Sequence, residues 1–215
     1  MQKRYTFTAA AAVLAMSVTG VAIAQDPVLT REPAQVLSGS YILDPAHGKI
    51  TWSVDHMGFS TYVGQFSDVD ATLHLDSANP AASRLDASVR MDSVGTFSDG
   101  LDAHLKTADF FDTANFPTAS FRATSIRLTD ADSAHITGDL TMRGVTRPIV
   151  IAADFNQAGI NPVSNTYTVG FDGRAMIRRS DFGIAYGLPA LGDEVTLHFE
   201  AEFLAAPAAQ PKGGA

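Results

Sequence analysis

The sequence of 215 residues contains no cysteine. Disulfide bonds are therefore excluded, and no cysteine follows the apolar stretch near the N-terminus to accept a lipid. The folded part of the chain has to be stabilised by its own hydrophobic core.

Basic residues are few, and they are not clustered. The chain has 15 lysines and arginines against 23 aspartates and glutamates, which gives a formal net charge of −8. Nucleic acids and anionic membrane surfaces would repel such a protein, so we expect neither as a partner. Ordinary solubility is sufficient to explain the acidic excess.

Motifs of the common enzyme families are missing. The chain has no Gly-x-Ser-x-Gly, Gly-x-Gly-x-x-Gly, P-loop or His-Glu-x-x-His sequence. Its six histidines are never two or four residues apart, so no local pair has metal-ligand spacing. We therefore expect a protein that is not an enzyme and has no metal or cofactor, while a metal site assembled from distant strands stays open.

The one long apolar run lies at the N-terminus. Lys3 and Arg4 precede an apolar stretch over 9–23 that ends in small residues, which is typical of a secretory signal peptide cleaved after Ala24. A membrane anchor is the alternative, but the run is short and is diluted by polar residues. We therefore predict export to the periplasm. The predicted parts are a signal peptide (1–24), a flexible segment (25–40), one domain (41–204) and a disordered tail (205–215).

Apolar and polar residues alternate with a period of two through most of the domain. In “VDATLHLD”, Val69, Ala71 and Leu73 alternate with polar residues. This alternation is typical of strands with one buried and one solvent-facing side. The eight predicted strands are KITWSVDH (49–56), VDATLHLD (69–76), LDASVRMD (85–92), ASFRATSIRL (119–128), AHITGDLTM (134–142), PIVIAADF (148–155), YTVGFDGRAMI (167–177) and the segment 195–203.

Eight such strands can form a sandwich or close into a barrel. A barrel removes exposed strand edges, and at eight strands its interior can hold one small ligand. Several segments reach about 10 residues or more, which favours a tall, tilted barrel over a compact sandwich. We predict an all-β fold, an extended eight-stranded antiparallel barrel, with a sandwich as the alternative.

The stretch “HLKTADFFDTANFP” (104–117) interrupts the strand pattern. Ser98 or Asp99 can cap a helix that leads into it, and Pro117 prevents its continuation. We predict one short helical segment over about 99–114 that covers part of the barrel. The apolar residues at helical spacing are Leu101, Leu105, Ala108 and Phe111.

The same stretch mixes acidic residues with a histidine. Asp102 and His104 are close in sequence, but residues two apart on a helix point about 200° away from each other. A cap or a polar anchor is therefore the simpler role for these side chains. The alternative is a hydrolase or lyase that acts on a small amphiphile with Asp102, His104 and Asp109 as acid/base groups in a water-accessible pocket.

Composition leaves the state of the barrel interior open. The strands and the interrupting stretch carry many phenylalanines, which ordinarily fill the core of a small barrel. Small residues such as Ala71, Ala87 and Gly138 lie among the large ones and could leave room for a ligand. A filled core and an internal cavity are both compatible with this sequence.

Two arginines follow each other closely in “MRGVTRP” (142–148). The ordinary interpretation is a tight turn with Gly144 at positive φ and solvated arginines. The functional interpretation places Arg143 and Arg147 at a barrel rim, where two cations could contact a polar headgroup.

Two long motifs resemble those of a known family. “DAHLKTADFFD” (102–112), followed by Phe116-Pro117 and Phe121, resembles the DxHL(R/K)SxDFFD…(F/Y)PxxxF signature of the YceI-like polyisoprenoid-binding family. “GDLTMRGVTRP” (138–148) is similar to its GDLTIKGVTRPV signature, and “YILDPAHGKITWSVDHMGFS”, “GQF” and “RSDFGI” fit in the same order. Many members carry an arginine where this chain has Leu101.

The resemblance implies an extended, lipocalin-like barrel, usually exported, that holds an isoprenoid chain such as a quinone or polyprenyl lipid. It implies no metal and no established reaction. The leading hypothesis is therefore an exported protein that sequesters or transports an isoprenoid or similar amphiphile, with a membrane donor or acceptor protein and a homodimer as further expectations. A third hypothesis is a stress-related barrel whose partner is a protein that binds an exposed apolar patch.

The expected binding residues come from the inward strand faces and the helical segment. They are Trp52, Phe59, Phe66, Met91, His104, Leu105, Phe110, Phe111, Phe116, Phe121, Leu140, Met142 and Phe171. The expected headgroup or rim contacts are Lys106, Arg143 and Arg147.

Overall fold

A computed structural model gives the fold and describes residues 29–207. The strands are β1 (Gly39–Leu43), β2 (Lys49–His56), β3 (Ser60–Phe66), β4 (Val69–Leu75), β5 (Arg84–Arg90), β6 (Val94–Gly95), β7 (Thr118–Leu128), β8 (Ser133–Met142), β9 (Val145–Ile160), β10 (Tyr167–Arg178) and β11 (Leu191–Ala205). The helix is α1 (Asp99–Leu105), and short 3-10 turns are η1 (Pro33–Gln35), η2 (Pro80–Ala82), η3 (Met91–Ser93) and η4 (Arg179–Phe182).

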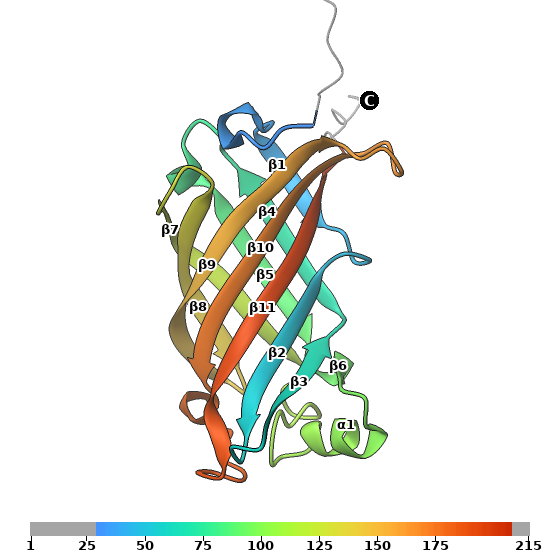
Figure 1. The fold of residues 1–215 in the computed structure, drawn as a ribbon, viewed down its shortest axis with the longest axis vertical. Coiled ribbons are helices and arrows are strands. Elements are labelled where there is room, and N and C mark those ends of the chain that lie inside the picture. The colour runs from blue at the N-terminus through green and yellow to red at the C-terminus, as the bar shows by residue number, and fades with distance from the viewer. Residues whose placement is uncertain (1–28, 208–215) are drawn as a thin grey trace, which may run out of the picture.

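The strands close into a barrel (Figure 1). Antiparallel pairing runs in the order β1-β4-β5-β7-β8-β9-β10-β11, and β11 then pairs with β1. The other half of β11 pairs with β2, which continues through β3 to β6. Because the last strand, β11, pairs with the first strand, β1, neither strand leaves an unpaired edge where they meet.

Three of the barrel strands are interrupted. Along β11, β1 pairs Leu43 with Phe203 and β2 pairs Lys49 with Glu200, so β1 and β2 are two halves of one barrel strand. In the same way β3 continues into β4, and β5 continues into β6. Eight long antiparallel strands therefore form the barrel, which confirms the predicted fold class.

The period-two pattern located eight of the segments but missed β1, β3 and β6. With five and two residues, β1 and β6 are too short to show an alternation. In β3 the inward side carries Gly64 between Tyr62 and Phe66, so the apolar pattern is broken at its centre. Each missed segment is the continuation of a strand that the pattern did predict.

The helix is shorter than predicted. Ser98 caps α1 by accepting a hydrogen bond from the Leu101 N–H, but the helix ends at Leu105 rather than near residue 114. The following residues form successive turns, and Asp112 has a φ of 50°, which interrupts a right-handed helix. The prediction that Ala108 and Phe111 lie on a helix is therefore wrong.

A packed hydrophobic cluster fills the lower end of the barrel in Figure 1, beside α1. We call this cluster the plug. Leu101, Phe110 and Phe111 pack against it from the helix and the turns, so the interrupting stretch covers the closed end of the barrel. Its buried members are Trp52, Phe66, Met91, Val94, Leu105, Ala119, Met142, Ile177, Phe182 and Ile184.

A buried arginine holds the loop between β10 and β11 at this end. Arg179 is 6% exposed, and its guanidinium donates hydrogen bonds to four backbone carbonyls, two in the loop and two at the start of β11. The bonds to the Gly192 and Tyr186 oxygens measure 2.7 and 2.9 Å, and those to Ile184 and Leu191 measure 3.2 Å. Because five fixed N–H groups meet converging carbonyls, one side chain orders the whole loop.

The described part of the predicted flexible segment is packed on the upper end of the barrel. Thr30 bridges to Ala158 of β9, and Val36 is buried. The Leu37 N–H donates to the Tyr167 hydroxyl, while the Tyr41 hydroxyl donates to the Leu37 carbonyl. For these residues the prediction of a flexible segment is therefore corrected.

The predicted signal peptide and most of the predicted tail, 208–215, lie outside the described residues. Within residues 29–207, no helix combines the length and apolar character needed to cross a membrane.

We predict that Arg179→Lys destabilises the protein by about 3 kcal/mol, because an ammonium cannot replace a fork of N–H donors and buried carbonyls lose their partners. The measurement is urea unfolding at equilibrium. Arg178→Lys is the matched control: Arg178 is exposed, and its nearest ionic partner, Glu194, is 3.9 Å away. We expect it to change the free energy of unfolding by less than about 0.5 kcal/mol. Equal effects of the two variants would show that Arg179 does not order the loop.

Candidate functional site

An apolar cavity of about 260 Å³ lies inside the barrel above the plug. Successive side chains of a strand point to opposite faces, so every second residue faces the cavity. On β4, for example, Ala71 and Leu73 line it. Other wall residues are Leu43, Val69, Leu75, Leu85, Ala87, Phe121, Ile126, Ala134, Ile136, Leu140, Ile149, Ile151, Ala153, Phe155, Phe171, Gly173, Leu197, Phe199, Ala201 and Phe203.

Small residues on neighbouring strands create the space. Ala71 of β4 lies opposite Ala87 of β5, and both face the cavity. On the other side of the barrel, Ala153 of β9 pairs with Gly173 of β10, and both line the cavity as well. Because two small residues are adjacent at each place, the large side chains around them do not meet across the barrel.

The two ends of the cavity differ. At the upper end it is lined by loop and terminal residues, among them Pro33, Val36, Pro80 and Ala131. At the lower end the lining residues also belong to the plug, so the plug forms the floor. These shared residues are Ile50, Val89, Ala119, Leu140, Ile149 and Leu197.

Three of the expected binding residues lie in the cavity wall, namely Phe121, Leu140 and Phe171. Most other predicted ligand contacts lie in or against the plug. Trp52, Phe66, Met91, Leu105 and Met142 are buried members of it. None of these five is part of the wall of the cavity that residues 29–207 form.

The predicted phenylalanines of the interrupting stretch also lie away from the cavity. Phe111 packs edge-on against Phe66, with ring centroids 5.3 Å apart, while Phe110 lies against His104 and Tyr186. Phe116 lies beneath Gly144. The expectation that this stretch covers the ligand space is therefore corrected, because it covers the plug.

Phe59 is 88% exposed in the turn between β2 and β3. Its predicted place on an inward face is therefore wrong. Since β2 ends at His56 and β3 begins at Ser60, Phe59 lies beyond both strands, where the alternation no longer determines its side.

The predicted cationic contacts lie toward the closed end. Arg143 and Gly144 have φ values of 50° and 72° and form the tight turn between β8 and β9 that the sequence predicted. Arg143 donates hydrogen bonds to the carbonyls of Phe110 and Gly183. Arg147 is exposed on the outside of β9, and Lys106 follows the end of α1, so neither lies at the upper end of the cavity.

The acid/base candidates form two separate contacts. Asp102 accepts hydrogen bonds from the backbone N–H and the hydroxyl of Thr96, at 2.7 and 2.6 Å, so it fixes the chain before α1. His104 Nε2 lies 2.9 Å from Asp109 Oδ2, and its ring contacts Phe110 and Tyr186 edge-on. This His–Asp pair lies outside the plug and does not line the cavity of the described chain.

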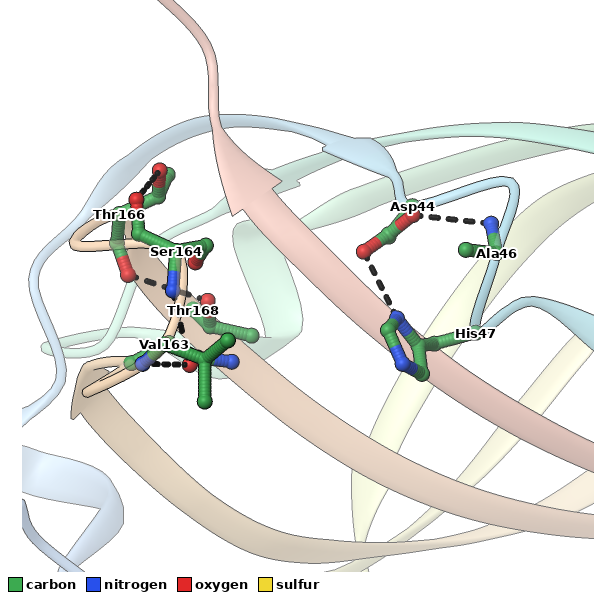
Figure 2. Close-up of polar contacts among 8 residues, drawn as sticks. Asp44, Ala46, His47, Val163, Ser164, Thr166 and Thr168 are labelled. Carbon is green, nitrogen blue, oxygen red and sulfur yellow. Dashed lines mark hydrogen bonds and ion pairs between the residues drawn. The ribbon is translucent and has the colours of Figure 1, made fainter.

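A second polar group, which the sequence did not reveal, lies at the break between β1 and β2. His47 Nδ1 lies 2.8 Å from Asp44 Oδ2, and Asp44 Oδ1 accepts a hydrogen bond of 2.9 Å from the Ala46 N–H (Figure 2). Glu202 of β11 completes the one group within residues 29–207 that could hold a metal ion, with ligand atoms within 4.8 Å of one another. Glu202 is far from Asp44 and His47 in the sequence, so only the folded structure brings the three side chains together.

The pair shifts both pKa values. The hydrogen bond with His47, followed by the one from the Ala46 N–H, lowers the pKa of Asp44. The bond to Asp44, followed by the charge of Glu202, raises the pKa of His47. Each group therefore stabilises the charged form of the other.

A closed eight-stranded barrel with an apolar cavity that reaches one end and a packed plug at the other defines a lipocalin-like barrel protein. The chain belongs to the YceI-like family, because the YceI-like domain model matches residues 41–203.

Relatives in bacteria support this assignment. A UPF0312 protein of Azotobacter vinelandii is 35% identical over 170 residues, which cover 78% of this chain and 88% of that protein. A UPF0312 protein of Pseudomonas savastanoi pv. phaseolicola is 37% identical over 152 residues, which cover 70% and 79%.

Solved structures show the same fold. The YceI protein of Campylobacter jejuni is 29% identical and superposes with a TM-score of 0.64, covering 71% of this chain and 90% of that one. BcnA of Burkholderia cenocepacia gives 0.67 at 23% identity, covering 76% and 99%. A polyisoprenoid-binding domain from Saccharophagus degradans gives 0.57 at 13% identity, covering 79% and 100%.

We predict a pH-dependent contribution from the Asp44–His47 pair. The raised pKa of His47 adds stability below its ordinary value of 6.5 that is lost as the pH rises through the raised value. The lowered pKa of Asp44 adds stability above 3.8 that is lost as the pH falls through the lowered value. His47→Ala should therefore lower the melting temperature more at about pH 5.5 than at about pH 9.

Asp44→Asn supplies the control, because it removes the charge partner and retains the acceptor for the Ala46 N–H. In an Asp44→Asn background, the extra loss of melting temperature that His47→Ala causes at about pH 5.5 should be smaller, and the charge of Glu202 accounts for what remains. An undiminished pH-dependent difference in this background would show that Asp44 does not stabilise the charged form of His47.

Proposed function

We propose that this protein binds an isoprenoid or similar amphiphilic lipid in the barrel cavity and carries or stores it. The observation that supports this function is the apolar, one-ended cavity between the plug and the upper loops. A cavity with such walls offers an apolar chain a binding site of matching chemistry.

Energetics support occupation of the cavity. The side chains of the cavity wall have no packing partners on their inward side, so they lack the dispersion contacts that a filled core would give. A hydrocarbon chain that fills the space would restore these contacts.

The family supports the same class of ligand. The Saccharophagus degradans neighbour is a polyisoprenoid-binding domain, and its barrel superposes on this chain. The chain also retains the two long family motifs, at 102–112 and 138–148. In this protein those motifs build the plug and the β8–β9 turn, so they maintain the closed end of the binding cavity.

A membrane is the proposed source and destination of the ligand. Moving about 40 apolar carbons out of water would release about 30 kcal/mol, beyond the affinity limit near 20 kcal/mol. A lipid that leaves a bilayer exchanges one apolar environment for another, so the net change is small. Such a balance allows both loading and release, with delivery through a membrane protein and homodimerisation remaining predictions.

We predict that protein isolated in a native buffer yields a near-stoichiometric lipid on solvent extraction, identified by mass spectrometry. Ala71→Phe should abolish this recovery, because the ring would occupy the space opposite Ala87. Thr72→Phe is the matched control, since Thr72 is exposed on the outer side of the same strand and should leave the lipid bound.

Melting temperatures of both variants establish that the barrel is folded. Recovery of the lipid from folded Ala71→Phe would show that it binds elsewhere. Absence of lipid from the wild type, together with failure to take up an added isoprenoid, would exclude the proposed function.

We also propose that the N-terminal segment directs export to the periplasm. Its basic start and apolar run end in a small-residue pattern at Ala24. Expression of the full chain in a Gram-negative host should give a periplasmic protein. Its intact mass should be that of a chain whose first residue is Gln25. A full-length mass in the cytoplasmic fraction would contradict export.

A further inference from the structure

Three side chains of metal-ligating type meet where the barrel closes. Asp44 and His47 belong to the turn that joins β1 to β2, and Glu202 lies on β11. One ligand atom from each, a ring nitrogen and two carboxylate oxygens, lies within 4.8 Å of the others. The sequence has no local pair of metal ligands, so this group is of the kind that only distant strands can assemble.

The group lies on the outer surface of the barrel. Ala201 and Phe203 line the cavity, so the side chain of Glu202 between them points outward. Leu43 lines the cavity at the end of β1, and Asp44 is the residue that follows it. The three side chains are therefore separate from the proposed lipid site and can be tested independently of it.

Backbone hydrogen bonds hold the three residues together. The Asp44 N–H donates to the Glu202 carbonyl at 2.8 Å, and the His47 N–H donates to the Asp44 carbonyl at 3.0 Å. The Asp44 carboxylate is fixed as well, because Oδ1 accepts from the Ala46 N–H while Oδ2 faces His47 (Figure 2). Ligands that are positioned in this way lose little further freedom when they bind an ion.

The charges around the group favour a cation. Within residues 29–207, the Glu202 carboxylate has no ion pair shorter than 4.0 Å, and its register partner on β10 is Gly170, which has no side chain. Lys49 is close enough to act on His47, but it pairs in register with Glu200 of β11. Acidic groups therefore outnumber basic ones at this place, and their combined field attracts a cation.

We propose that Asp44, His47 and Glu202 bind one zinc ion, with water in the remaining coordination position. Imidazole nitrogen and carboxylate oxygen are ordinary ligands of Zn²⁺, at about 2.0–2.2 Å from the ion. Two ligands of a tetrahedral ion are then about 3.4 Å apart, so side chains that now lie within 4.8 Å need only small rotations to close on it. The imidazole favours zinc over Ca²⁺ and Mg²⁺, which prefer oxygen ligands.

Zinc at this site links two parts of the fold. It takes the place of the proton that Asp44 and His47 share, and this proton leaves to solvent, because His47 ligates as neutral imidazole. The Asp44–His47 contact lies within one turn, whereas Glu202 belongs to the strand that closes the barrel. The ion therefore stabilises the closure of the barrel at the break between β1 and β2.

Calorimetric titration of metal-free protein that carries no histidine tag tests the site. We expect one Zn²⁺ to bind per chain, and Co²⁺ in its place should give the intense visible absorption of a four-coordinate ion. Zinc should raise the melting temperature of the wild type, because it binds the folded state. Ca²⁺ and Mg²⁺ at the same concentration should not displace it.

Variants assign the ligands. His47→Ala, Asp44→Asn and Glu202→Gln should each weaken zinc binding at least about tenfold, since even residues behind a ligand contribute about 10–100-fold. The matched controls are His135→Ala on β8 and Glu194→Gln, an exposed glutamate farther along β11. Both controls should keep the wild-type affinity, and melting temperatures without metal establish that every variant is folded.

The remaining results would overturn the proposal. Zinc binding that all three ligand variants leave unchanged would show an adventitious ion only. Weaker binding in the His47 and Asp44 variants but not in Glu202→Gln would confine the ion to the turn and exclude the link to β11. Displacement by Ca²⁺ would show a carboxylate site in which His47 has no part. Failure of the wild type to bind zinc would exclude the site, and lipid recovery would still test the cavity separately.

Discussion

The pairing of β11 with β1 and β2 is the interaction on which the rest of the structure depends. It closes the sheet, and closure forces every second residue of eight strands into a common interior. The sizes of these inward residues then decide what the interior becomes. Toward α1 they are large, and they pack into the plug. Farther up, alanines and a glycine face one another and leave the cavity.

Closure also explains where the polar residues of the main motifs lie. The plug has to be sealed from water, and the seal is built from one short helix and several turns. The polar groups of such irregular backbone need hydrogen-bond partners from side chains. Asp102 accepts a hydrogen bond from the Thr96 N–H, and Arg179 donates to four carbonyls. The charged and aromatic residues that suggested an active site thus stabilise the closed end.

The sequence predicted the fold well because period-two alternation is a direct consequence of a one-sided strand. It did not predict the breaks in three barrel strands, since a strand of two or five residues carries too little pattern. It placed the helix end too late, because apolar spacing continued through Phe111 while hydrogen bonding changed to turns at Leu105. Tertiary contacts, which the sequence does not display, decided both cases.

The candidate site was predicted less well for a related reason. Alternation tells which residues face inward but not how far along the barrel axis each one lies, so Trp52 and Phe171 seemed equivalent. The structure separates them, with Phe171 in the wall and Trp52 in the plug. The wall consists largely of common aliphatic residues and alanines, and no local motif marks them. The prediction therefore relied on the aromatic and charged residues of the interrupting stretch, which form a recognisable motif but lie away from the cavity.

The cavity links lipid binding to the stability of the barrel. Its wall side chains lack packing partners on their inward side, whereas the plug side chains have them. A bound apolar chain would supply these contacts. The proposed ligand would then complete the core above the plug, so barrel stability and lipid occupancy would rise together.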